Sequence, residues 1–156
     1  MLRKLGEVLT GISSSLTFEE FSNRSMERES EIRQAAMENK KVVYFYGCFA
    51  NFNDPGGEGR GTIDVLRKNG FDVVLPPQAC CGIASLSNGD THSVIPDAQF
   101  NVETLAAYID RGFDVIYSAP SCGMAIVEEY PRLLESEDAQ KVANHCYEIH
   151  EFLKIL

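Results

Sequence analysis

Four of the five cysteines in this sequence are placed where they could do chemistry: Cys48, Cys80, Cys81 and Cys122. Each lies shortly after an apolar run, whereas Cys146 stands apart near the end of the chain. Thiolates are the ligands that soft metal ions and iron–sulfur clusters select, so four convergent thiols would suit either centre. The odd number of cysteines argues against a disulfide framework. Metal binding, thiol–disulfide chemistry and plain burial in a core remain open.

The adjacent pair Cys80 and Cys81 is the most specific of these features. Neighbouring side chains diverge in a regular strand, so two adjacent thiols reach one centre only from an irregular loop. Two prolines before the pair and a glycine after it favour such a loop. Backbone N–H groups at the start of a following helix or turn should lower the thiol pKa values. Three flanking glycines would let the backbone approach a bulky centre closely: Gly47, Gly82 and Gly123.

The elements that must position these thiols alternate between strands and helices. Apolar runs at 42–46, 71–75 and 113–117 are typical of strands buried on both faces of a parallel sheet. Helices are expected at 62–69 and 98–111, each ended by a glycine. A further helix is broken near Pro131, and a last one presents apolar residues at 149, 152, 153 and 156. We therefore predict an α/β fold, a three-layer, Rossmann-like domain with a small parallel sheet.

This sheet would bring the four thiols together. Cys48 follows the first strand, the adjacent pair follows the second, and Cys122 follows the third. The carboxyl ends of parallel strands share one edge, where such folds bind ligands. Cys146 is expected on a late helical segment, in a packing role. We therefore predict one metal or cofactor site whose ligands are Cys48, Cys80, Cys81 and Cys122.

The chain divides into two parts by composition. Residues 1–40 are rich in charges of alternating sign and predict an N-terminal helical segment with solvated faces. Residues 41–156 hold all the apolar strand signals and all five cysteines, and they predict a single cysteine-rich domain. A length of 156 residues suits one domain of ordinary size.

Charge and hydropathy exclude several function classes. The net charge is −9, and there is no basic run, so a nucleic acid is not an expected partner. The longest apolar stretch, at 42–45, is far shorter than the ~20 residues of a membrane span. No signal peptide is evident, and a cytoplasmic location is expected.

The cysteine motifs resemble those of the cysteine-rich CCG domain family, which includes a subunit of heterodisulfide reductase. The segments that carry the resemblance are "YFYGCFANFNDP", "ACCGIASLSNGD" and "SAPSCGMAIVEEYP". They cover about residues 41–135, with 31 residues between Cys48 and Cys80 and 40 between Cys81 and Cys122. Within the family, the chain is most similar to the first of the two CCG modules found in anaerobic glycerol-3-phosphate dehydrogenase.

The resemblance implies an iron–sulfur electron-transfer module of a flavin-dependent dehydrogenase. That enzyme would oxidise sn-glycerol 3-phosphate or a related hydroxy acid and pass electrons toward a quinone or membrane acceptor. The implied partners are flavoprotein subunits and a second CCG module, so the chain is expected to be part of a longer two-module subunit. The implied location is cytoplasmic, peripheral at the inner face of the membrane.

The family motif closes with Cys-x-x-Cys, but here Ala125 stands where the last cysteine would be. The complete motif implies a non-cubane cluster with five cysteine ligands. Four thiols still satisfy a 4Fe-4S cube or a tetrahedral zinc site. A degenerate module that only docks partners, without a cluster, is the remaining alternative.

Overall fold

A computed structural model describes residues 40–156. The predicted N-terminal helical segment, 1–40, lies almost entirely outside the described residues. The described chain forms one four-stranded sheet of order β2-β1-β3-β4. Its strands are β1 (Lys40–Phe45), β2 (Phe71–Val74), β3 (Asp114–Tyr117) and β4 (Cys146–Glu148). All three pairings are parallel, which confirms the predicted α/β fold.

Strand β1 organises the sheet because both of its edges are paired. Val43 lies opposite Val74 of β2 on one side and opposite Val115 of β3 on the other. A strand in this position is covered on both faces, which explains why its sequence is a continuous apolar run rather than an alternating one. The last four residues of β1 are accordingly all buried.

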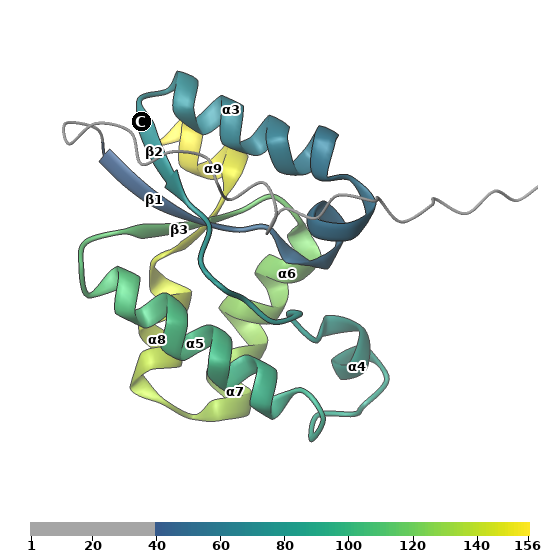
Figure 1. Ribbon diagram of the computed structural model, residues 1–156. Coiled ribbons are helices and arrows are strands. Elements are labelled where there is room, and N and C mark those ends of the chain that lie inside the picture. The colour runs from purple at the N-terminus through teal and green to yellow at the C-terminus, as the bar shows by residue number, and fades with distance from the viewer. Residues whose placement is uncertain (1–39) are drawn as a thin grey trace, which may run out of the picture.

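The helices cover both faces of the sheet (Figure 1). Helices α3 (Arg60–Lys68) and α9 (Ile149–Lys154) lie on one face, where Leu66 and Phe152 belong to one buried cluster with Val42. Helices α5 (Ile95–Ile109), α7 (Tyr130–Leu134) and α8 (Glu137–Asn144) cover the other face. There, Val43 and the alternate apolar residues of β1 and β3 join the largest cluster of buried side chains. The molecule therefore has the predicted three layers.

Strand β4 corrects the expectation that Cys146 lies on a helical segment. The three residues Cys146–Glu148 pair with Val115, Ile116 and Tyr117 of β3. A strand of three residues contains too few positions to show an apolar run, and it directly precedes an amphipathic helix, so its sequence resembles the start of that helix. Cys146 is buried within the sheet layer.

The connections are more regular than the sequence suggested. Two π-helical turns, η1 (Phe49–Asn53) and η2 (Pro55–Gly59), connect β1 to α3. The long loop after β2 contains a short helix, α4 (Ile83–Ser87).

The helical stretch near Pro131 begins with α6 (Pro120–Met124) and passes through a π-helical segment, η3 (Ala125–Glu129), into α7. Pro131 has no N–H to donate to the preceding turn, and the π-helical segment lies just before it. The predicted break is therefore a change of helical pitch.

Candidate functional site

The four predicted site cysteines all lie beyond the carboxyl ends of strands β1, β2 and β3. Cys48 is the N-cap residue of η1, the first π-helical turn after β1, and Cys80 and Cys81 lie in the loop that follows β2. Cys122 lies in the first turn of α6, which follows β3. Cys48 and Cys80 are exposed, whereas Cys81 and Cys122 are buried. The site therefore has a solvent-facing half and a core-facing half.

The thiols contact one another in a row. Cys48 interacts with Cys80, Cys80 with Cys81, and Cys81 with Cys122. Three segments that are distant in sequence thus bring their thiols close enough to affect one another's pKa values. In residues 40–156, no three Cys, His, Asp or Glu side chains are placed so that they could hold a metal ion. The thiols adjoin in pairs rather than around one centre.

The expectation of lowered thiol pKa values is wrong for three of these cysteines. The Cys122 thiol raises the pKa of Cys81 to about 11, and burial adds to this. The neighbouring Cys81 thiol, followed by burial, raises the pKa of Cys80. Burial and the Cys80 thiol raise the pKa of Cys48. Backbone N–H groups do act in the predicted direction, but crowding of thiols and burial outweigh them.

Gly47 is the glycine that most directly shapes the thiol row. It has a φ of +65°, and a Cβ there would lie 2.7 Å from the Cys122 Sγ. A side chain at this position would therefore collide with a site sulfur as well as strain the backbone. Gly82 and Gly123 instead make room for the side chains of Val94 and Tyr117. Of these three glycines, only Gly47 shows the predicted close approach of the backbone to a thiol.

Gln78 ties the loop of the adjacent cysteines to the end of β1. Its Oε1 accepts from the Gly47 N–H at 3.0 Å, and its Nε2 donates to the Tyr44 carbonyl at 3.4 Å. Because Gly47 precedes Cys48 and Gln78 lies two residues before Cys80, this one side chain sets the spacing between two thiol-bearing segments.

A second network holds the same loop from the helical layer. The Asn101 Oδ1 on α5 accepts from the Ala79 N–H at 2.8 Å. The Asn101 Nδ2 donates to the Ala79 and Cys80 carbonyls and, at 3.1 Å, to the Tyr130 hydroxyl. That hydroxyl donates in turn to the Cys81 carbonyl at 3.1 Å. An irregular loop cannot pair its own backbone groups, so these two side chains satisfy them.

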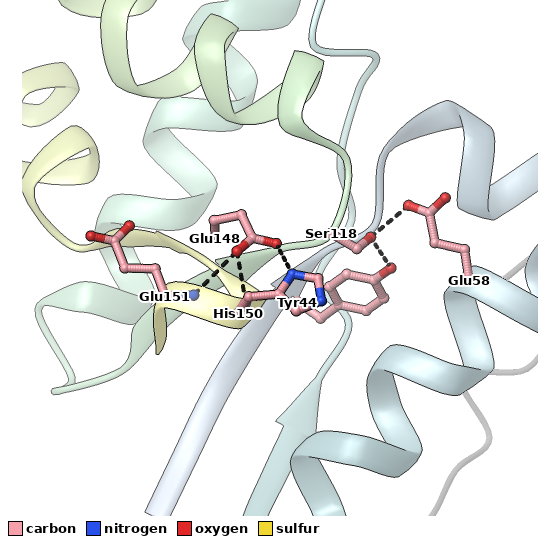
Figure 2. A network of polar contacts seen from close by, with 6 residues as sticks. All are labelled: Tyr44, Glu58, Ser118, Glu148, His150 and Glu151. Carbon is pink, nitrogen blue, oxygen red and sulfur yellow. Dashed lines mark hydrogen bonds and ion pairs between the residues drawn. The ribbon is translucent and has the colours of Figure 1, made fainter. Parts of the chain in front are cut away.

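A third network lies beside the ends of β1 and β3, on the face covered by α3. Figure 2 shows Ser118 between Tyr44 and Glu58. The Ser118 hydroxyl donates to Glu58 Oε1 at 2.7 Å and accepts from the Tyr44 hydroxyl at 2.7 Å. Burial raises the pKa of Tyr44, although its hydrogen bond to Ser118 works against this. The phenol is therefore a neutral donor.

Thiols follow the carboxyl ends of β1, β2 and β3, but none follows the carboxyl end of β4. Glu148 caps α9 by accepting from the His150 and Glu151 N–H groups, and its other oxygen contacts His150 Nδ1 at 2.7 Å (Figure 2). Cys146 lies two residues earlier, and apolar burial alone raises its pKa. The fifth cysteine is thus separate in position and in chemistry.

Sequence reasoning missed Asn101, Gln78 and Ser118. An asparagine on an amphipathic helix is typical of an exposed position, and nothing local indicates that Asn101 is buried. Tyr130 belongs to a Glu-Tyr-Pro motif, which by itself does not reveal its role. The prolines and the adjacent cysteines marked an irregular loop, and that loop's need for hydrogen-bond partners was the one available signal.

Comparison with known proteins places these motifs in context. The sequence profile described as "CCG: Cysteine-rich domain" matches residues 42–127. The chain is 30% identical over 141 residues to a subunit of anaerobic glycerol-3-phosphate dehydrogenase from Escherichia coli, covering 88% of this chain and 35% of that protein. It is 31% identical over 119 residues to lactate utilization protein A of Bacillus pumilus, covering 72% and 48%.

A third relative is a subunit of the CoM/CoB fumarate reductase of Methanothermobacter marburgensis, 30% identical over 94 residues, covering 59% of this chain and 18% of that protein. The chain therefore spans less than half the length of each of these relatives. No solved structure matches it. None of the helices in residues 40–156 has the length and apolar character needed to cross a bilayer.

Proposed function

The chain belongs to the cysteine-rich CCG domain family, and from this premise we propose that it is an iron–sulfur electron-transfer module of a flavin-dependent dehydrogenase complex. The observation that carries the proposal is the row of four thiols at the carboxyl edge of the sheet. The three relatives belong to a dehydrogenase, a lactate-utilization system and a fumarate reductase. A dehydrogenase and a fumarate reductase both catalyse redox reactions.

The ligands in this proposal are Cys48, Cys80, Cys81 and Cys122. Four thiolates match the donor set of a 4Fe-4S cube, and the gap that Gly47 leaves at Cys122 keeps one sulfur close to the end of β1. Exposed Cys48 and Cys80 can change rotamer without disturbing the core, which would turn the row toward a common centre. A bound cluster would supply one-electron transfer.

The complex and its substrate are also part of the proposal. The relative in Escherichia coli supports sn-glycerol 3-phosphate as the reductant, and the lactate-utilization relative supports a hydroxy acid. Flavoprotein subunits and a second CCG module would be the partners, with a quinone or membrane acceptor at the inner face of the membrane. Phe52 and Met124 are exposed on segments that follow β1 and β3, and they give the carboxyl edge of the sheet an apolar character suited to protein contact.

Ala125 supports a second candidate, a docking scaffold without a cluster. Its side chain is fully buried in the main core, three residues after Cys122, at the place where the family motif has its last cysteine. An alanine at this core position removes one thiol ligand of the family motif. The four thiols that remain would also be enough for a structural module that binds zinc.

Anaerobic purification of the full chain, followed by iron, sulfide and zinc analysis, tests these functions. The electron-transfer module is expected to hold about four irons and four sulfides per chain and to show a reversible change in visible absorption on reduction. One zinc without sulfide would identify the structural module. A chain that holds neither metal, even after reconstitution with iron and sulfide, would leave the docking scaffold.

A further inference from the structure

We propose that Asn101 and Tyr130 are positioning residues for the adjacent cysteines. Together they fix the backbone of residues 79–81, so that Cys80 and Cys81 present their thiols to one site. This role deepens the proposed function and rests on it only for the nature of the bound centre. The two residues come from different helices, α5 and α7, and both act on the loop through its backbone groups.

The loop that carries the adjacent cysteines needs an external template. The chain from Leu75 to Gly82 has no regular secondary structure, and two of its residues are prolines without an N–H group. A regular strand there would send the two adjacent side chains to opposite faces. The irregular path that avoids this leaves backbone groups without strand partners, and their positions must be fixed by something else.

The side chains of Asn101 and Tyr130 supply this template. Asn101 forms hydrogen bonds with both backbone polar groups of Ala79, accepting from its N–H and donating to its carbonyl. The Tyr130 hydroxyl donates to the carbonyl of Cys81. The amide of Asn101 also donates to the Tyr130 hydroxyl, so that each residue orients the other.

Burial restricts this template to one geometry. Asn101 and Tyr130 are each 0% exposed, and the bond between them is buried. A buried hydrogen-bond network in which every partner is used is geometrically demanding, because a misplaced group stays unpaired. The network therefore allows one arrangement of the two cysteines rather than several.

The test compares two buried cysteines in the same molecule. The metal-free, reduced chain is treated with iodoacetamide, and the modification rates of Cys81 and Cys146 are measured by peptide mass spectrometry. Both thiols are buried, so global unfolding exposes both, whereas loosening of the loop exposes Cys81 alone. Tyr130→Phe keeps the ring and removes the hydroxyl. We expect the ratio of the Cys81 rate to the Cys146 rate to rise by about fivefold, which corresponds to the loss of one net hydrogen bond.

Tyr44→Phe is the matched control, since it removes another fully buried tyrosine hydroxyl from the opposite face of the sheet. We expect it to lower the melting temperature without changing the ratio of rates. Asn101→Asp keeps the acceptor for the Ala79 N–H but loses the amide NH2, whose two N–H groups serve three acceptors, so its ratio should exceed that of Tyr130→Phe. If Asn101→Asp does not fold, Tyr130→Phe alone decides.

A second readout follows the bound centre. After reconstitution with iron and sulfide, Tyr130→Phe should shift the midpoint potential of the chain relative to Tyr44→Phe at equal iron content. If the ratio of rates stays the same in both variants, or rises equally in both, the positioning role is wrong. If the unaltered chain takes up no iron but the ratio still rises in Tyr130→Phe, the positioning of the thiols stands and the proposed electron-transfer function fails.

Discussion

Cys122 comes just after strand β3 and Cys146 lies in the neighbouring strand β4, yet the two thiols have different chemical surroundings. Cys122 follows β3 and contacts Cys81, whose pKa it raises more than any other group does. Cys146 begins β4, beside β3, and its pKa is raised by burial alone. Cys122 belongs to a row of four thiols beyond the strand ends, whereas Cys146 fills space within the sheet layer.

The difference teaches that the position along a strand, not the residue type, decides what a cysteine does here. Beyond the carboxyl end, the backbone turns through loops and first helical turns, where glycines such as Gly47 let chain segments meet. Within the strand, the backbone is paired, and a side chain can only pack. Each of the following predictions changes one side of this comparison.

Loss of bound iron is the largest effect expected. Cys81→Ser should abolish iron and sulfide loading because a hydroxyl is a poor ligand where a thiolate is required. Cys146→Ala should load like the unaltered chain. The measurement is iron and sulfide per chain after anaerobic reconstitution. Full loading of Cys81→Ser together with poor loading of Cys146→Ala would reverse the ligand assignment.

Gly47→Ala should destabilise the strand-end side of the comparison. The positive φ costs about 1 kcal/mol for a non-glycine residue, and the contact with the Cys122 Sγ adds to that, so a loss of about 2 kcal/mol is expected. Urea unfolding of the metal-free chain measures it. Gly61→Ala, inside α3 with open space around its Cβ, is the matched control and should stabilise by up to about 1 kcal/mol.

Cys146→Ala should lower the free energy of unfolding by about 1 kcal/mol, because it removes one buried heavy atom from a packed layer. The same urea experiment measures the change, and the midpoint potential of the loaded chain should stay unchanged. A shift in that potential would show that β4 influences the thiol row, and the comparison would then fail.

Glu148→Gln should give the smallest change, visible only in its pH dependence. Partial burial raises the pKa of Glu148, but bonds from His150 and Glu151 outweigh it, and the net pKa is lowered. A lowered carboxylate pKa stabilises the fold above the unfolded value of 4.5, and this contribution is lost as the pH falls through the folded value.

Unfolding measured at pH 7 and at pH 3.5 should therefore show a smaller acid-induced loss in Glu148→Gln than in the unaltered chain. Because its partner His150 is largely exposed, the difference should be less than about 0.5 kcal/mol. An equal loss in both proteins would mean that the cap does not depend on charge.

The sequence predicted what apolar runs can encode. Strands β1, β2 and β3, their parallel pairing and the place of the four cysteines beyond them all follow from buried runs separated by helices. Strand β4 escaped prediction because three residues beside a stronger neighbour in β3 need little intrinsic signal. Tertiary contacts, rather than local preference, make it a strand.

The fine geometry of the site was not predictable for a related reason. Asn101 lies 22 residues from Ala79, whose N–H donates to it, and Tyr130 lies 49 residues from Cys81. Such partners are set by how helices pack on the sheet, which no local pattern records. The raised thiol pKa values likewise arise from thiols that meet only in three dimensions.

The central place of β1 also fixes an order of events during synthesis. Val42 and Val43 can pair with β2 early, but their other edge waits for Asp114 and Val115 of β3. Translation at about 5–20 residues per second separates Cys81 from Cys122 by roughly 2–8 s. During that interval Cys48, Cys80 and Cys81 have been synthesised without their fourth companion. The row of thiols is therefore completed only after Cys122 has been synthesised, and the first three cysteines must be kept reduced until then.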